Sequence, residues 1–222
     1  MLIIPLGKKD SEGIPVITLF TCLACILVHV FANTPADRLA LAFNPGQLDP
    51  LKMFTSVFTH ADIWHLVGNL FFFYCFARTI EARITAAGFV LAFIVFVLST
   101  NLAYAASARE PISTLGLSGV VWGYMGMFLF RYPKDYIECW VLFLNKIELP
   151  AAIFILAFLT LDIAAYRHTE IVTVNYVAHF SGFAAGALFR MAFWNTFSTV
   201  NAEPGKRVPD GSRLAHSRAA RR

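Results

Sequence analysis

Three short segments place polar side chains inside otherwise apolar stretches of the sequence. They are His65-Leu-Val-Gly-Asn69, Gly116-Leu-Ser118-Gly119 and Ala178-His179-Phe-Ser-Gly182-Phe-Ala-Ala-Gly186. A serine hydroxyl becomes a good nucleophile when a neighbouring base takes its proton, and neutral histidine has a suitable pKa for that role. An acyl-transfer site also needs N–H donors aimed at the developing oxyanion. Ser118 and His179 are therefore the candidate nucleophile and base. His65, Asn69 and the Ser118 backbone amide are the candidate oxyanion donors.

Carboxylates are scarce around these residues. No Asp or Glu lies close in sequence to Ser118 or His179, and Asp162 is the only acid expected inside an apolar stretch. A Ser–His dyad without an acid is therefore favoured over a triad. Each polar residue also has a purely structural explanation. A serine in a membrane helix often bonds back to its own chain, and His or Asn can join two packed helices.

Glycine spacing indicates how the serine and the histidine could meet. The first stripe of glycines surrounds Ser118 at spacings of 3, 4 and 3, and consists of Gly116, Gly119, Gly123 and Gly126. The second stripe follows His179 and consists of Gly182 and Gly186. Small residues at such spacing line one helix face and let two backbones approach closely. The two stripes therefore predict a close contact between the helix that carries Ser118 and the helix that carries His179.

The overall composition is that of a membrane protein. Of the 222 residues, 58% are apolar, 15% aromatic and only 14% charged, and 22 are phenylalanine. A soluble domain carries about a quarter charged residues and could not bury so many aromatics in one core. Soluble enzymes, disordered chains and disulfide-rich secreted domains are excluded. Six apolar stretches predict six membrane-spanning helices in an all-α polytopic protein: Gly13–Ala36, Ile63–Ala77, Ile84–Ala108, Pro111–Phe130, Leu149–Leu161 (extended to about Tyr166) and Ile171–Phe189.

Basic residues predict the orientation of these spans. With six spans, 14 of the 18 Lys and Arg residues fall on the side that holds both termini. Cytoplasmic segments collect Lys and Arg, so both termini are expected in the cytoplasm. The expected organisation is a cytoplasmic N-terminus (1–13), a six-helix domain (14–196) and a basic, disordered tail (197–222). Anionic lipid is a better expected contact for this tail than nucleic acid.

The sequence gives no sign of a metal or cofactor. The zincin pattern H-E-x-x-H does not occur. The spacing of Cys22 and Cys25 matches a redox motif, but it lies in an apolar span. We therefore expect all four cysteines, at positions 22, 25, 75 and 139, to be buried small hydrophobes without a disulfide.

Together the three segments resemble the signature motifs of rhomboid intramembrane serine proteases. They occur in the family's order, on the second, fourth and sixth predicted spans, and the first segment extends back to Phe58 as Phe58-Thr-His60-Ala-Asp-Ile-Trp-His65. The resemblance covers roughly residues 14–195, and Glu81 at the end of the second span also fits it. It implies Ser118 as nucleophile, His179 as base, and His65 with Asn69 as oxyanion-hole residues.

The resemblance also implies a fold and a substrate class. The expected fold is a six-helix bundle with a short central fourth helix, its serine below a water-filled opening to the outer face. The connection Asn33–Asp62 would be the family's membrane-embedded outer loop. One departure is Trp122, where bacterial members often have tyrosine, although stacking on His179 should survive. Expected substrates are single-span membrane proteins, and the expected location is a bacterial inner membrane.

Two other classes of function stay open at this point. A catalytically inactive rhomboid-like protein would bind membrane helices without cutting them, although such proteins typically lack the serine or the histidine. A small proton-coupled transporter could instead use His179, His65 and Asp162 as a proton path, but the internal repeats common in transporters are absent from the sequence. Labelling by a fluorophosphonate separates these classes, since only an activated serine should react.

Overall fold

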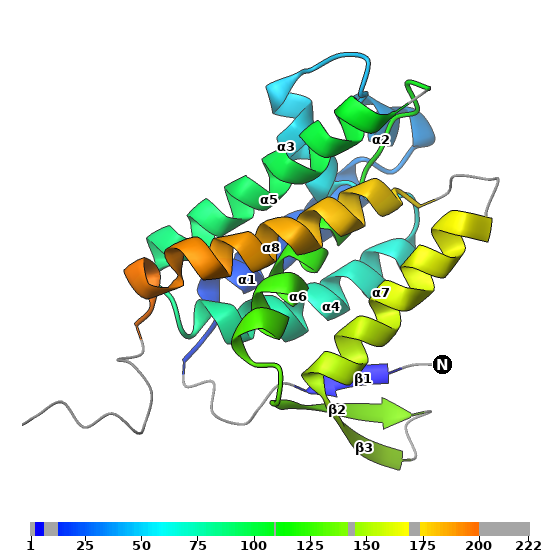
Figure 1. The fold of residues 1–222 in the computed structure, drawn as a ribbon. Helices are drawn as coiled ribbons and strands as arrows, with labels where there is room; N and C mark the ends of the chain where they lie inside the picture. The colour runs from blue at the N-terminus through cyan, green and yellow to red at the C-terminus, as the bar shows by residue number, and fades with distance from the viewer. Residues whose placement is uncertain (1–2, 7–12, 109, 142–144, 169–173, 200–222) are drawn as a thin grey trace, which may run out of the picture.

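The computed structural model describes residues 3–6, 13–108, 110–141, 145–168 and 174–199, which form eight helices and three strands (Figure 1). The helices are α1 (Val16–Phe31), α2 (Pro35–Leu41), α3 (Pro50–Phe58), α4 (Ile63–Glu81), α5 (Ala86–Ser107), α6 (Ser118–Arg131), α7 (Ala151–His168) and α8 (Tyr176–Phe197). The strands are β1 (Ile3–Leu6), β2 (Tyr136–Val141) and β3 (Asn145–Pro150).

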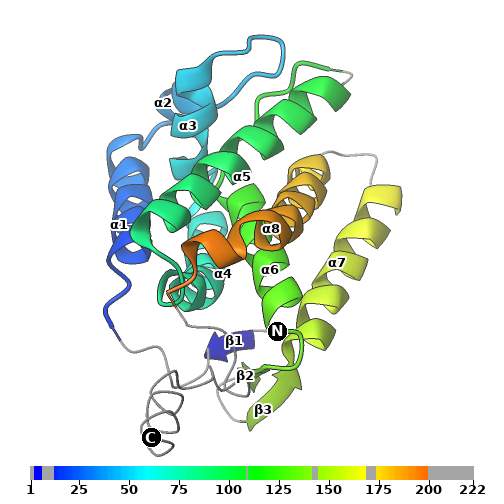
Figure 2. The same ribbon diagram turned by 60° about the vertical axis from the view of Figure 1, so that its left-hand side comes forward.

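Helix α6 lies at the centre of the bundle, packed against α4, α5 and α8, with α7 along one side (Figure 2). All of its residues from 119 to 129 are buried. A helix that is apolar on every face is stable only when neighbours surround it. With 14 residues it is also the shortest of the six long helices that correspond to the predicted spans, as the resemblance implied. It is therefore about 21 Å long.

Each predicted span overlaps one long helix, namely α1, α4, α5, α6, α7 or α8, but several boundaries differ. The fourth span was expected from Pro111, whereas α6 begins only at Ser118. Helix α8 continues to Phe197 and so includes Arg190. By length and apolarity, α4 and α5 are the helices of the described chain that could cross a membrane, and α1 is a shorter apolar helix.

A small antiparallel sheet corrects the expectation of an all-α fold. Strand β2 lies between β1 and β3, with Ile3 opposite Val141 and Tyr136 opposite Pro150. The sheet lies at the end of the bundle where α7 begins (Figure 1). The segment Tyr-Ile-Glu-Cys-Trp-Val is rich in the aromatic and β-branched residues that favour strands. The segment lies between the fourth and fifth predicted spans, where no strand was expected from the sequence.

The connection between α1 and α4 folds into two short helices. Thr34 and Asp37 form a reciprocal capping box at the start of α2. Asp49 caps α3, whose first residue is Pro50. The segment then contacts the chain just before α6, where Phe43 forms an antiparallel bridge with Thr114. The connection between α1 and α4 therefore supports the loop that leads into the central helix.

Glu81 joins the end of α4 to the beginning of α1. Its carboxylate accepts hydrogen bonds from the backbone N–H groups of Ile17 and Thr18, both at 2.8 Å, and from the Thr18 hydroxyl at 2.6 Å. The first N–H groups of a helix have no partner within that helix. Glu81 therefore caps α1 from a distant part of the sequence.

Candidate active site

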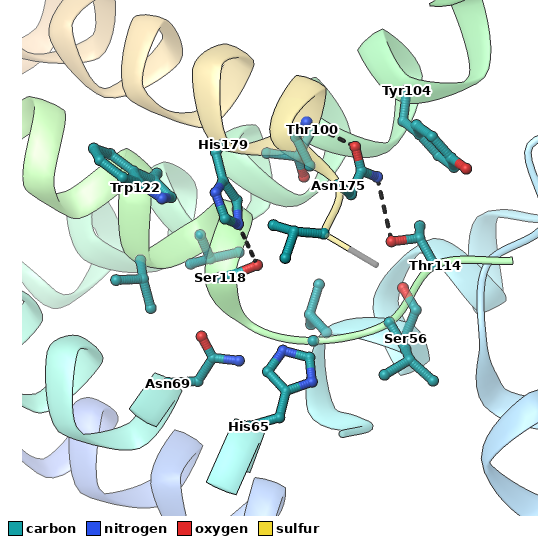
Figure 3. Close-up of a pocket in the computed structure, with 18 of the residues that line it drawn as sticks. Ser56, His65, Asn69, Thr100, Tyr104, Thr114, Ser118, Trp122, Asn175 and His179 are labelled. Carbon is teal, nitrogen blue, oxygen red and sulfur yellow. Dashed lines mark hydrogen bonds between the residues drawn. The ribbon is translucent and has the colours of Figure 1, made fainter. Parts of the chain in front are cut away.

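The structure brings Ser118 and His179 into direct contact. Ser118 Oγ lies 2.9 Å from His179 Nε2, although 61 residues separate the two in sequence (Figure 3). Ser118 is the first residue of α6, and His179 lies in the first turn of α8 and is buried. The distance is a hydrogen-bonding distance and suits proton transfer from the hydroxyl to the imidazole.

Glycines hold α6 and α8 close enough for this contact. A Cβ on Gly182 would overlap the carbonyl oxygen of Gly119, and a Cβ on Gly126 would overlap the carbonyl oxygen of Phe183. The predicted close contact between the two helices is therefore confirmed. Gly116 does not belong to the stripe, because it lies before the start of α6 and faces His65 instead.

The loop before Ser118 is fixed by the connection between α1 and α4. The N–H of Gly116 donates to the carbonyl of Ser56 at 2.9 Å, and the N–H of Leu117 donates to His60 Nε2 at 3.4 Å. Gly116 has a φ of +116°, a backbone conformation that residues with a side chain rarely adopt. A Cβ at this position would also lie 2.8 Å from the His65 ring. Glycine is therefore required where the chain turns into α6.

His60 is a site residue for which sequence reasoning gave no role. It is fully buried, it accepts the Leu117 N–H, and its ring lies edge-on to the His65 ring with centroids 5.2 Å apart. Burial, with the neighbouring His65 imidazole as a second cause, lowers the pKa of His60 to about 3. His60 is therefore a neutral acceptor that supports the residue next to Ser118.

His65 and Asn69 lie beside Ser118 on α4, and Figure 3 shows both facing the same cavity. Asp62 positions this helix start, because its side chain accepts from the backbone N–H groups of Trp64 and His65 at 2.8 and 2.9 Å. These hydrogen bonds hold the pKa of Asp62 below its usual range.

The Asn69 side chain has an unused donor. Among the described residues, its buried Nδ2 has no hydrogen-bond partner. An unpaired buried donor costs about 1–3 kcal/mol, so most are paired in folded proteins. Its position beside Ser118 makes it available to an acceptor that enters the cavity.

Asp162 is a second residue that sequence reasoning left out of the site. Its Oδ2 lies 2.5 Å from His179 Nδ1, the ring nitrogen that does not face Ser118. The expectation that no acid accompanies Ser118 and His179 is therefore wrong, because a carboxylate lies within hydrogen-bonding distance of the imidazole. The one available signal was that Asp162 is an acid in an apolar stretch, and such residues usually have a functional reason.

Aromatic rings cover the imidazole on two sides. The Trp122 and His179 ring centroids lie 5.8 Å apart with a 34° tilt, so the predicted ring contact forms as a tilted contact and not as a parallel stack. Tyr176 lies edge-on to the same imidazole, with centroids 6.1 Å apart. These contacts limit rotation of the His179 side chain.

The site opens into a cavity of about 580 Å³. It is lined by Ser118, His179, Asp162, His65, Asn69 and Asn175, together with residues of the loop before α6. Asn175 caps α8 by accepting from the Ala178 N–H and donates to the Thr114 hydroxyl (Figure 3). One water occupies roughly 30 Å³, so the cavity can hold several waters beside the serine.

Among the described cysteine side chains, none lines this cavity. Cys25 and Cys75 are buried and Cys22 is half-buried, and Cys22 and Cys25 are free thiols. The side chain of Cys139 and the basic tail from residue 200 lie outside the described residues. In the described part of the chain, no group of three or more His, Cys, Asp or Glu side chains is placed to hold a metal ion.

Comparison with known proteins identifies the family of the chain. The Rhomboid domain family matches residues 47–196. Similar proteins include the rhomboid protease GlpG of Salmonella newport (strain SL254), Salmonella typhimurium (strain LT2) and Salmonella choleraesuis (strain SC-B67). Each is 24% identical over 125 residues, which cover 54% of this chain and 45% of the relative. The chain thus spans a little under half the length of these relatives. Because the family match covers most of the sequence, the chain belongs to the rhomboid family.

Proposed function

We propose that the chain is a serine endopeptidase that cuts membrane-protein substrates within the bilayer. The observation that carries this proposal is the 2.9 Å distance between Ser118 Oγ and His179 Nε2 inside a cavity. The family and its protease members support the same activity. Rhomboid proteins are integral membrane proteins, and a bacterial inner membrane is the proposed location.

In the proposed reaction, Ser118 Oγ attacks the scissile carbonyl carbon while His179 Nε2 takes the hydroxyl proton. The tetrahedral oxyanion accepts hydrogen bonds from Asn69, His65 and the Ser118 backbone N–H, at a helix start where N–H groups are unpaired. His179 then gives its proton to the leaving amine as the C–N bond breaks. A cavity water repeats the sequence on the acyl-enzyme and frees Ser118.

The proposed membrane arrangement has six spans, α1, α4, α5, α6, α7 and α8, with both termini in the cytoplasm. Helix α6 is about 21 Å long, which is shorter than the roughly 30 Å hydrocarbon core. If its cytoplasmic end lies at the membrane surface, Ser118 lies below the outer surface. This depth supports cleavage of a substrate helix near its outer end, with single-span proteins as the proposed substrates.

The test combines fluorophosphonate labelling of the purified chain with cleavage of a single-span reporter in detergent. The wild type should be labelled at Ser118 and should cut the reporter. Ser118→Ala and His179→Ala should each lose about 10⁵–10⁶-fold in kcat, and the double variant should lose little more, because the two residues act as one unit.

Ser181 offers a matched control on α8. Its hydroxyl donates to the Val177 carbonyl at 2.7 Å and does not line the cavity, so Ser181→Ala should keep wild-type labelling and cleavage. Efficient cleavage by Ser118→Ala would overturn the proposal. A wild type that binds the reporter without labelling or cleavage would indicate an inactive binding protein. Proton flux without labelling would indicate the transporter.

A further inference from the structure

The pairing of Asp162 with His179 goes beyond a serine–histidine dyad. Asp162 belongs to α7, and its carboxylate oxygen lies 2.5 Å from His179 Nδ1. Its side chain is only 22% exposed. A carboxylate inside an apolar helix is energetically costly, so a partner is needed to keep it there.

We infer that Asp162 is the positioning acid of a Ser–His–Asp triad in this chain. The inference rests on the proposed protease function and concerns how His179 is prepared for it. A carboxylate accepts a hydrogen bond and donates none. When it accepts from Nδ1–H, the neutral imidazole carries its proton on Nδ1, and the Nε2 lone pair faces Ser118 Oγ.

The carboxylate also acts after the serine proton has moved. His179 then carries protons on both nitrogens, and the Asp162 negative charge beside Nδ1 stabilises this cation inside a largely buried site. No proton moves to Asp162 in this step. The carboxylate therefore supports both the starting tautomer and the charged intermediate without touching the substrate.

The position of Asp162 on α7 separates this role from simple packing. The first turns of α7 are held by buried apolar residues, including Ala151, Phe154 and Ile155. Beyond them, Leu161 and Ile163 on either side of Asp162 are exposed by 64% and 41%. Apolar packing at the start of the helix therefore fixes α7 independently, whereas the carboxylate contacts the catalytic histidine.

Asp162→Asn is the sharpest variant, because it keeps the size and can keep a hydrogen bond. Its amide would donate to Nδ1 and favour the tautomer that carries its proton on Nε2, which cannot accept the serine proton. We expect the rate of fluorophosphonate labelling and kcat to fall by about 10²–10⁴-fold with KM nearly unchanged. In a His179→Ala background, Asp162→Asn should cost nothing further.

Two controls distinguish positioning from a structural tether. Thr160 lies on the exposed side of the same helix, where its hydroxyl donates a hydrogen bond to the Leu156 carbonyl. The control variant Thr160→Val should therefore retain wild-type rates. ¹⁵N NMR of histidine-labelled protein, assigned by difference from His179→Ala, should find the His179 proton on Nδ1 in the wild type and on Nε2 in Asp162→Asn. If Asp162 were only a structural tether, Asp162→Asn would change the melting temperature or KM and leave the His179 tautomer unchanged.

The outcomes separate this inference from the proposed function. If Ser118 is labelled in the wild type and equally fast in Asp162→Asn, the triad is overturned while the protease proposal stands. If Ser118 is not labelled in the wild type, the protease proposal fails. In that case the NMR arm alone decides whether Asp162 sets the His179 tautomer, and an unchanged tautomer in Asp162→Asn would overturn the inference as well.

Discussion

Gly186 of α8 lies against Gly123 of α6 so closely that a Cβ at position 186 would overlap the Gly123 carbonyl oxygen. The same Cβ would lie 2.9 Å from the backbone nitrogen of Met127. Both obstacles are backbone atoms of a buried helix, which cannot move aside as a flexible side chain can. Gly186 follows His179 on α8, so this contact also fixes the position of the His179 imidazole relative to Ser118.

Gly186→Leu should therefore lose stability and activity together. Overpacking a tight core costs about 1–3 kcal/mol, and a shift of about 1 Å in a catalytic group can cost 10²-fold in rate. Thermal unfolding and reporter cleavage in detergent measure the two effects. Ala184→Leu places the same leucine side chain on the exposed side of α8 and should change neither. A fully active and equally stable Gly186→Leu would mean that α6 and α8 do not meet at this glycine.

The sequence predicted the helices better than their ends. Apolar length and glycine spacing were enough to expect the long helices and the contact between α6 and α8. The start of α6 was not predictable, because it depends on Gly116 bonding to Ser56, 60 residues earlier in the chain. The pairing of β1 with β2 likewise joins residues far apart in the chain, Ile3 with Val141, so local sequence patterns could not predict it.

The residues of the candidate site likewise fall into those that the sequence could predict and those that depend on the fold. Ser118, His179, His65 and Asn69 were recognisable because each is polar within an apolar stretch and stands in a motif. Asp162 met only the first criterion, and its contact with His179 depends on how α7 packs beside α8. His60 has a motif neighbour in His65, but its role depends on the Leu117 N–H, which is visible only in the folded chain.

Glu81→Ala should weaken the attachment of α1 to α4. The variant leaves the N–H groups of Ile17 and Thr18 without their acceptor, and hydrogen bonds to a charged group contribute about 1.5–3 kcal/mol. We expect a lower melting temperature with kcat nearly unchanged at temperatures where the variant is folded. Thr18→Val removes one of the three hydrogen bonds and should give a smaller decrease. An unchanged melting temperature in Glu81→Ala would contradict the capping role.

His60 should make stability depend on pH. The folded pKa of about 3 lies below the ordinary value of 6.5, so the unfolded chain binds a proton that the folded chain does not. Stability is then complete above pH 6.5 and decreases as the pH falls towards 3, by up to ~1.4 kcal/mol per pH unit. His60→Gln keeps an acceptor for the Leu117 N–H and lacks this titration.

Melting temperatures of both proteins between pH 7 and 4.5 measure the His60 effect. The wild type should lose stability more steeply than His60→Gln on acidification, with the two curves separating below pH 6.5. Because all other histidines are shared, the difference between the curves belongs to position 60. Parallel curves would mean that His60 is protonated in the folded protein.

Asn69→Ala should slow the chemical step without weakening substrate binding. The Asn69 Nδ2 is buried beside Ser118 without a partner among the described residues, so its donor is free for an oxyanion. Loss of one such donor costs about 10²–10³-fold in kcat. Asn101 is a contrasting buried amide, because its Nδ2 already donates to the carbonyls of Met53 and Val97 at 3.1 and 3.0 Å. Asn101→Ala should therefore lower the melting temperature, which Asn69→Ala should not. An increase in KM at constant kcat in Asn69→Ala would place this side chain in substrate binding instead.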